Sequence, residues 1–271
     1  MPNEQPIWEA DKVAVFSPHH TCNFKCPYCI SATQTEAKPD SRVYDSSIWI
    51  DLVQNNWMIE ISGGEPLLSP QTIMFANKLV AMGGRVLILT NGTNLQEYER
   101  LLSDGVGVLA CWHPSQIPLR EFYCVSERKN TKYKYMLHPQ YLEQCGRFWR
   151  DMEQWKSAAK KNVLNIGVFE GEIQGEFLCA DHPRYRFLTE DGRDSYIRHL
   201  FMPRKNLIIE SNGSVYGNYY MDQPMGSVFD YDMRNLETLP PKPYIAIRKD
   251  LRDLEKAQIA YAKAIDKVFQ P

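Results

Sequence analysis

The chain has 271 residues, of which 44% are hydrophobic and 24% are charged, with a formal net charge of −2 and a pI near 6.3. This length suits one large domain, or one domain with a small appendage, and the weak charge disfavours nucleic acid as a partner. No apolar run approaches the roughly 20 residues that cross a bilayer, so no membrane association is expected. Seven cysteines, an odd number, and the lack of a signal-peptide pattern predict reduced thiols and a cytoplasmic protein.

The first half of the chain alternates short apolar runs with helical patterns, which is typical of successive parallel βα units. Strands are predicted at 13–16, 58–61, 86–89, 108–112, 132–137 and 163–169. Helices are predicted at 45–55, from Pro70 to the pair Gly83–Gly84, from Asn94 to Leu102, and along an apolar stripe from Tyr141 to Ala159. Ser69 and the Asn94/Glu97 pair are candidate N-terminal caps for two of these helices.

Three cysteines, Cys22, Cys26 and Cys29, follow the first predicted strand with the spacing C-x3-C-x2-C. Thiolates so close together can face one inorganic centre, while the tight loop disfavours disulfides between them. A [4Fe–4S] cube is normally held by four thiolates, so three would leave one iron open for chemistry. A structural zinc site with His19 or His20 as its fourth ligand is the alternative.

A glycine-rich turn follows the second predicted strand and has the sequence Gly63-Gly64-Glu65-Pro66. Glycine permits a ligand to approach the backbone closely, and Glu65 offers a carboxylate to an ammonium group. A plain strand-to-helix turn is the alternative interpretation.

Together, the cysteine loop and the glycine turn resemble the motifs of the radical S-adenosylmethionine (radical SAM) enzymes. The resemblance covers the chain up to about residue 170. It implies an α/β fold, a partial (βα)6 TIM-like barrel, with a [4Fe–4S] cluster on the three cysteines and S-adenosylmethionine (SAM) as cofactor. It further implies that the turn from Gly63 to Pro66 holds the amino group of the methionine moiety, and that Tyr28 lies against the adenine.

Such barrels place their functional groups at the carboxyl ends of the strands. Asn91 follows the third predicted strand and is a candidate cofactor-binding residue, although Asn-Gly turns also occur for backbone reasons. Cys111 and His113 end the fourth strand, where the resemblance implies contact between His113 and the ribose of SAM. Cys111 and Cys179 are candidates to return a hydrogen atom to a substrate radical, as in radical epimerases, or are buried apolar residues.

After about residue 175 the pattern changes. An Asn-Gly turn between 207–210 and 215–216 predicts a β-hairpin. It resembles the hairpin of the SPASM/twitch extensions of radical SAM enzymes, but Gly217-Asn218 stands where a cluster cysteine is expected. A terminal helix is predicted at 251–269. We therefore expect a barrel core over 1–175 and a small C-terminal α+β extension over 176–271 that covers or completes the barrel.

The resemblance also implies an activity. One electron from a flavodoxin or ferredoxin would lead to reductive cleavage of SAM. The 5′-deoxyadenosyl radical would then abstract hydrogen from a small molecule or peptide in a biosynthetic pathway, with dehydrogenation, epimerisation or bond formation as the outcome. Activation of a glycyl radical enzyme and RNA modification are rival activities, and a non-catalytic zinc or electron-transfer module is the alternative from another class.

Overall fold

The computed structural model describes residues 10–26, 29, 38–118, 122, 130–137, 143, 165–168, 171–173, 176–178, 203–217, 224–237 and 239–243. Tyr28, Cys179 and the helix predicted at 251–269 lie outside these residues, as does the helix predicted at 141–159 apart from Glu143. Within the described part of the chain, no helix has the length and apolar character needed to cross a membrane.

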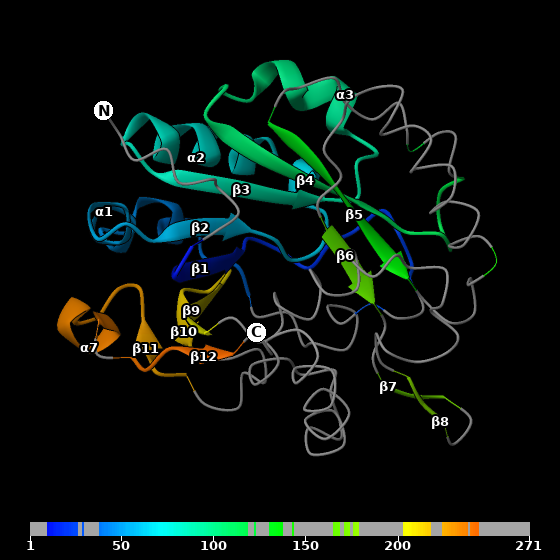
Figure 1. Cartoon of the computed structure of the whole chain (residues 1–271). Helices are drawn as coiled ribbons and strands as arrows, with labels where there is room; N and C mark the ends of the chain where they lie inside the picture. Colours follow the sequence, from blue (N-terminus) through cyan, green and yellow to red (C-terminus); the bar gives the residue numbers. More distant parts are fainter. Residues whose placement is uncertain are drawn as a thin grey trace, which may run out of the picture.

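A ten-stranded, mostly parallel sheet organises the described chain (Figure 1). Six strands follow one another in space as they do in sequence, and each pairs with the next in parallel. They are β1 (Lys12–Ser17), β2 (Met58–Ile61), β3 (Arg85–Thr90), β4 (Val106–Trp112), β5 (Thr131–Leu137) and β6 (Asn165–Val168). The six predicted strands and the α/β class are therefore confirmed. The fold is a partial TIM-like barrel, since the described strands leave the sheet open at β6.

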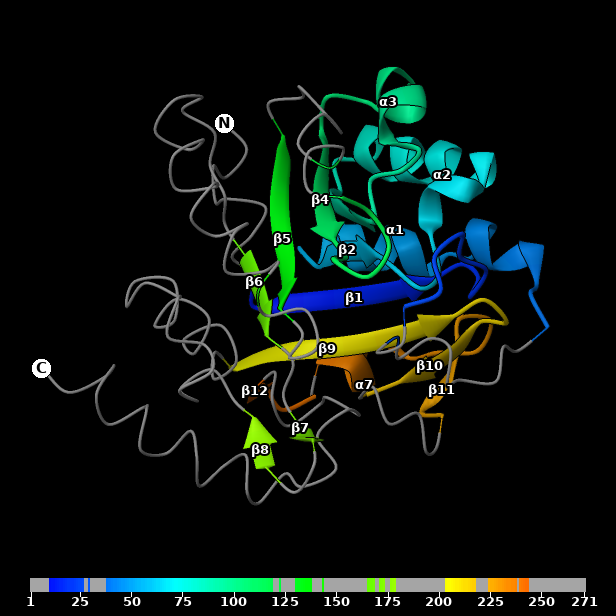
Figure 2. The ribbon, with the colours of Figure 1, turned by 90° about the vertical axis from the view of Figure 1, so that its right-hand side faces the viewer.

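The sheet continues past β1 on the side away from β2 (Figure 2). There β9 (Pro203–Glu210) pairs with β1 in parallel, and β10 (Ser214–Tyr216) returns antiparallel to β9. Gly213, with a φ of 85°, lies in the turn between them. The predicted hairpin is thus confirmed, and its first strand belongs to the main sheet.

The remaining strands are short. β11 (Gly226–Ser227) pairs with β10, and β12 (Lys242–Pro243) pairs with β9, both antiparallel. A separate two-stranded ribbon consists of β7 (Gly171–Ile173) and β8 (Glu176–Leu178).

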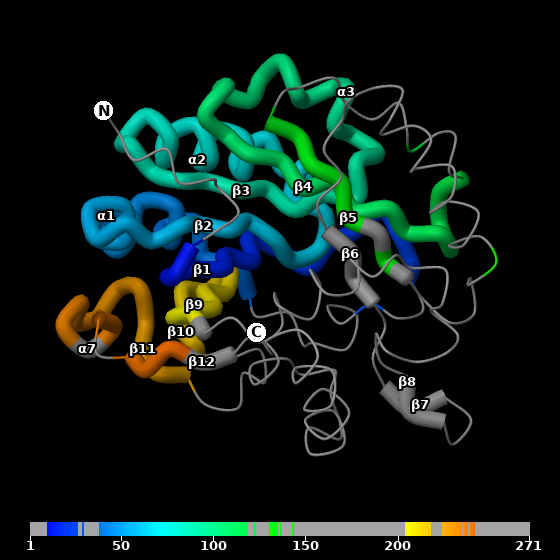
Figure 3. The backbone as a smooth tube through the Cα atoms, in the orientation of Figure 1, coloured from blue at the N-terminus to red at the C-terminus, as the bar shows by residue number. Residues whose placement is uncertain are grey.

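Helices α1 (Ile48–Gln54) and α2 (Pro70–Ala81) lie on one side of the sheet (Figure 3). The helix predicted at 45–55 begins later than expected, because a 3-10 turn, η2 (Ser41–Asp45), precedes it. The other described helical segments are η3 (Pro66–Leu68), α3 (Leu95–Tyr98), η4 (Glu99–Leu101) and α7 (Met233–Glu237).

The predicted end of α2 is confirmed, and Ser69 and Asn94 are the N-cap residues of α2 and α3 as predicted, although neither makes a side-chain cap. Gly83 has a φ of 85°, and the amides of Gly83 and Gly84 donate to the carbonyls of Val80 and Leu79, each at 2.9 Å, as in a Schellman motif. Neither Ser69 nor Asn94 caps its helix with its side chain. Ser69 uses its carbonyl, which accepts from the Thr72 amide at 3.0 Å. Asn94, with φ −102° and ψ 3°, is outside the extended region typical of N-caps.

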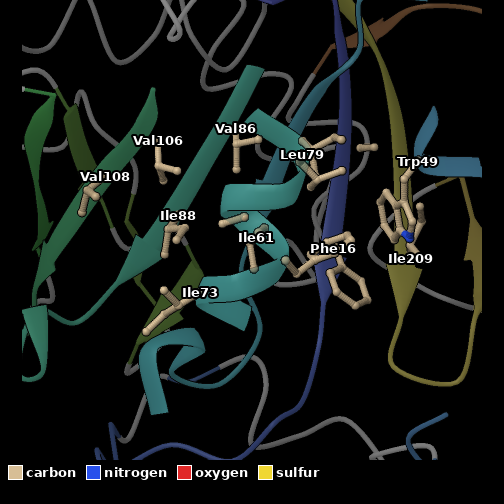
Figure 4. Packing of buried hydrophobic residues seen from close by; sticks show 14 of the residues in the cluster. Phe16, Trp49, Ile61, Ile73, Leu79, Val86, Ile88, Val106, Val108 and Ile209 are labelled. Atoms are coloured by element: carbon tan, nitrogen blue, oxygen red, sulfur yellow. The ribbon is translucent and has the colours of Figure 1, made fainter. Parts of the chain in front are cut away.

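Side chains alternate between the two faces of the sheet, and the faces differ. The face toward α1 and α2, here called the helix face, carries the larger apolar core (Figure 4). At its centre Phe16, Trp49 and Phe75 contact one another with ring centroids 5.0–5.4 Å apart. The opposite face, here called the inner face, has a smaller apolar cluster formed by Ala10, Val13, Val15, Met58, Leu87, Leu109, Cys111 and Ile208.

Candidate functional site

The cysteine loop leaves the carboxyl end of β1 and is held by three neighbouring strand ends. The amides of Gly64 and Glu65, after β2, donate to the carbonyls of His19 and Thr21, each at 2.9 Å. After β3, Thr93 accepts a hydrogen bond from the Asn23 side chain at 2.7 Å. After β4, the Gln116 side chain accepts from the Lys25 amide at 3.0 Å and donates to the Lys25 carbonyl at 3.2 Å. The loop is therefore fixed along its length rather than at its ends alone.

The two glycines of the turn are required because the cysteine loop passes against them. A Cβ on Gly63, whose φ is 113°, would lie 2.6 Å from the His19 carbonyl oxygen. A Cβ on Gly64 would lie 2.1 Å from the Thr21 carbonyl oxygen. Both obstacles are backbone atoms, which cannot move aside as a side chain does. Glycine thus allows the loop and the turn to pack directly together.

Glu65 links the turn to the end of β3. Its side chain is buried, and one carboxylate oxygen accepts from the Leu67 amide at 3.0 Å and from the Thr90 hydroxyl at 2.7 Å. The other oxygen accepts from the Asn91 amide at 2.7 Å. Burial raises the pKa of Glu65, while these three donors act to lower it. Pro66 then begins η3, for which Glu65 is the N-cap.

Asn91 reaches from the end of β3 into the cysteine loop. Its side-chain amide donates to the Asn23 side chain at 2.8 Å and lies 3.8 Å from Cys22 Sγ. Its side-chain oxygen accepts from the amide and hydroxyl of Thr93 at 3.0 and 2.6 Å. The structure therefore brings Asn91 and Cys22 together, as expected for neighbouring strand ends.

The three cysteines of the loop are reduced and half-buried. The Phe24 amide donates to Cys22 Sγ at 3.3 Å, and His113 Nδ1 lies 3.5 Å from Cys26 Sγ. Burial raises the pKa of Cys22, and the nearby Glu65 and Cys29 raise it further, against the effect of the Phe24 hydrogen bond. An electropositive centre bound at the loop would favour the thiolate forms.

The three thiolates of the loop suit the chemistry of a [4Fe–4S] cluster, which takes thiolate ligands. Among the described residues, no three His, Cys, Asp or Glu side chains converge closely enough to hold one metal ion. A structural zinc needs four ligands within about 2.0–2.3 Å of the ion, whereas a [4Fe–4S] cluster binds each thiolate through a different iron. His20 Nε2 lies instead 3.0 Å from Glu210 Oε2, and His19 Nδ1 lies 3.2 Å from the Thr21 carbonyl oxygen. The described geometry thus gives no support to the zinc alternative.

Cys111 and His113 both lie on the inner side of β4 and its continuation. Cys111 is buried in the inner-face cluster, and burial raises its pKa to about 11, so it stays a protonated thiol at neutral pH. Burial, with a smaller effect from Lys134, lowers the pKa of His113 to about 4, which favours the neutral imidazole. His113 was expected to contact a ribose; the structure places its ring beside Cys26.

A buried pair in this region, His20 and Glu210, has no local signal in the sequence. His20 and Glu210 contact each other with side chains only 7% and 6% exposed, although they are 190 positions apart. Glu210 ends β9 opposite Ser17 of β1. Because only the β1–β9 pairing brings them together, no local spacing indicates this contact, and the Asn-Gly turn that follows Glu210 is the one signal near it.

Known proteins share the fold but not the sequence. No protein-family model matches the chain, and no match was found among the curated proteins. The structure of anSMEcpe with bound AdoMet and Cp18Cys peptide matches with a TM-score of 0.57 and 13% identity, over 84% of this chain and 80% of that chain. SuiB from Streptococcus suis bound to S-adenosylmethionine matches with a TM-score of 0.51 and 14% identity. That match covers 89% of this chain and 66% of SuiB, slightly less than two thirds of its length. SuiB bound to the precursor peptide SuiA gives the same TM-score and identity. At these identities the likeness establishes the fold.

Proposed function

We propose that this chain is a radical SAM enzyme that acts on a small molecule or a peptide. The observation that carries the proposal is the contact between the cysteine loop and the glycine turn at the carboxyl ends of β1 and β2. The fold supports it, since anSMEcpe and SuiB with this fold have been solved with AdoMet bound. Within this proposal, peptide is the favoured substrate class, because both proteins have also been solved with a peptide.

In this proposal Cys22, Cys26 and Cys29 hold a [4Fe–4S] cluster. Such a cluster would supply one-electron chemistry, with a flavodoxin or ferredoxin as the electron donor, for reductive cleavage of SAM to methionine and a 5′-deoxyadenosyl radical. The chain positions the reactants. The backbone from Gly63 to Pro66 lies beside the cysteine loop, where it would hold the methionine moiety, and Asn91 secures the loop from β3. Tyr28 would complete the site against the adenine.

The inner face would receive the substrate. Cys111 lies there as a protonated thiol, the form that can return a hydrogen atom to a substrate radical. Its hydrogen exchanges with solvent, so deuterium should enter the product during turnover in D2O. Cys179 is the second candidate for this role. The type of reaction, the cytoplasmic location and the boundary between a core at 1–175 and an extension at 176–271 remain predictions.

The experiment is anaerobic reconstitution followed by measurement of iron and acid-labile sulfide per chain. We expect about four irons per chain, and formation of 5′-deoxyadenosine and methionine after addition of SAM and dithionite. The variant with Cys22, Cys26 and Cys29 all replaced by Ala should show neither, and Cys111→Ser should keep the iron. A wild-type chain that binds zinc stoichiometrically and takes up no iron would contradict the proposal.

A further inference from the structure

The sulfur atoms of the cysteine loop differ in the groups that contact them. Cys22 Sγ accepts from the Phe24 backbone amide at 3.3 Å and, at 3.8 Å, from the Asn91 side-chain amide. Cys26 Sγ lies 3.5 Å from a ring nitrogen, His113 Nδ1. A backbone amide is present whatever side chain occupies its position, whereas the contact on Cys26 depends on the identity of residue 113.

His113 is held both through its ring and through its backbone. Its edge-to-face contact with Phe24 has a centroid distance of 5.9 Å and an interplanar angle of 81°. The His113 carbonyl accepts from the amides of Gln116 and Ile117 at 3.0 and 3.2 Å. The Gln116 side chain in turn binds both backbone groups of Lys25, next to Cys26. The segment that carries the histidine is therefore bound to the segment that carries the cysteine, and the contact follows from this arrangement.

The direction of the hydrogen bond follows from the chemistry of an iron ligand. A cysteine bound to iron is a thiolate and has no proton to donate. In the neutral imidazole one ring nitrogen carries hydrogen and the other accepts. The hydrogen between His113 and Cys26 must then belong to Nδ1. A hydrogen bond to a cluster thiolate offsets the negative charge that reduction adds, and such bonds are among the factors that set the reduction potential.

We propose that His113 is a positioning residue for the cluster: its Nδ1–H donates a hydrogen bond to Cys26 Sγ and raises the reduction potential. The inference rests on the proposed function, because it requires a cluster on the cysteine loop. It assigns His113 a role other than contact with the ribose of SAM. The electron that activates SAM would then enter the cluster more readily than it would without the histidine.

Three substitutions separate the hydrogen bond from the bulk of the ring. His113→Phe keeps a ring against Phe24 and removes both nitrogens. His113→Asn places an amide N–H near the position of Nδ1, whereas the longer side chain in His113→Gln places it near the position of Nε2. Each reconstituted protein is titrated with dithionite under argon, and the reduced cluster is followed by electron paramagnetic resonance. Iron and sulfide are measured first in each sample.

We expect the Phe and Gln variants to be at least tenfold harder to reduce than the wild type, a shift of about 59 mV to lower potential for one electron. The Asn variant should stay near the wild-type value. Loss of the cluster from the Phe and Gln variants, with retention in the Asn variant, would also support the proposal. Equal potentials in the wild type and the Phe variant would overturn it, as would equal behaviour of the Asn and Gln variants or loss of the cluster from all three. A wild type that binds no iron would remove the proposed function, and this inference with it.

Discussion

The two faces of the sheet come from the same strands, yet they carry different residues. On β2, Ile59 and Ile61 point into the helix-face core, while Glu60 between them lies on the inner face. On β4, Ala110 and Trp112 belong to the helix face and Cys111 to the inner face. The helix face carries the larger apolar core, whereas the inner face mixes a smaller apolar cluster with groups that can ionise. Alternation along a strand lets one side stabilise the fold while the other is available for chemistry.

The largest expected loss of stability comes from one of two adjacent residues of β3. Ile88 is fully buried in the helix-face core, and Leu87 lies in the smaller inner cluster. We expect Ile88→Ala to lower the free energy of unfolding by about 3–5 kcal/mol, because helix and strand side chains surround the cavity. Leu87→Ala should lower the free energy of unfolding by about 2 kcal/mol, close to the free energy of burying the deleted methyl groups without a further penalty for a cavity. Urea unfolding followed by circular dichroism measures both.

The two residues are matched in size and strand, so each variant is the control for the other. Equal losses would mean that the inner face is packed as tightly as the helix face. In that case the inner face would have no room for a substrate.

A second comparison concerns Glu65, which is buried, and Glu60, which is half-buried. Glu65 accepts three hydrogen bonds at the edge of the sheet, and Glu65→Gln turns one acceptor oxygen into an amide nitrogen that faces a donor. The expected loss is roughly 3 kcal/mol at neutral pH. On the inner face, burial raises the pKa of Glu60 while Arg204 and Lys134 act to lower it. No described residue donates a hydrogen bond to it, so Glu60→Gln should leave stability almost unchanged. Equal losses of unfolding free energy in the two variants would show that the hydrogen bonds of Glu65 do not stabilise the turn.

The smallest expected effect is a dependence on pH at Cys111. Burial raises the pKa of this thiol from 9.0 to about 11. Because the unfolded chain loses the proton first, the contribution of the thiol is complete below pH 9 and is lost as pH rises toward 11. Between pH 9 and pH 11 the free energy of unfolding of the wild type should fall by up to about 2.7 kcal/mol more than that of Cys111→Ala. Parallel curves of unfolding free energy against pH for the two proteins would show that the thiol is not buried.

Much of the fold could be predicted from local sequence patterns. The bounds of β2 and the glycine end of α2 agree with the prediction, because short apolar runs and a glycine with positive φ act over a few residues. Both predicted N-cap positions also agree, but neither side chain makes a capping hydrogen bond. Residue type permits a cap, but the backbone angles decide whether it forms, as Asn94 shows.

The candidate site was predictable where it depends on position along one strand. The cysteine loop, the glycine turn and Asn91 were expected at strand ends, and there they meet. The Thr90 and Asn91 donors to Glu65 and the contact of His113 with Cys26 were not expected, because they depend on how the chain folds after β3 and β4. The His20–Glu210 pair was beyond sequence reasoning, since it needs β9 to lie beside β1.

The position of β1 between β2 and β9 has a consequence for synthesis. Ribosomes add roughly 5–20 residues per second, so about 10–40 s separate the emergence of Ser17 from that of its partner Glu210. During this interval no described strand pairs with the second edge of β1, and an unpaired edge is a template for association with other chains. During the same interval His20 cannot form its contact with Glu210. We therefore expect the nascent chain to depend on protection of this edge, and the cysteine loop to reach its final surroundings only after β9 has been made.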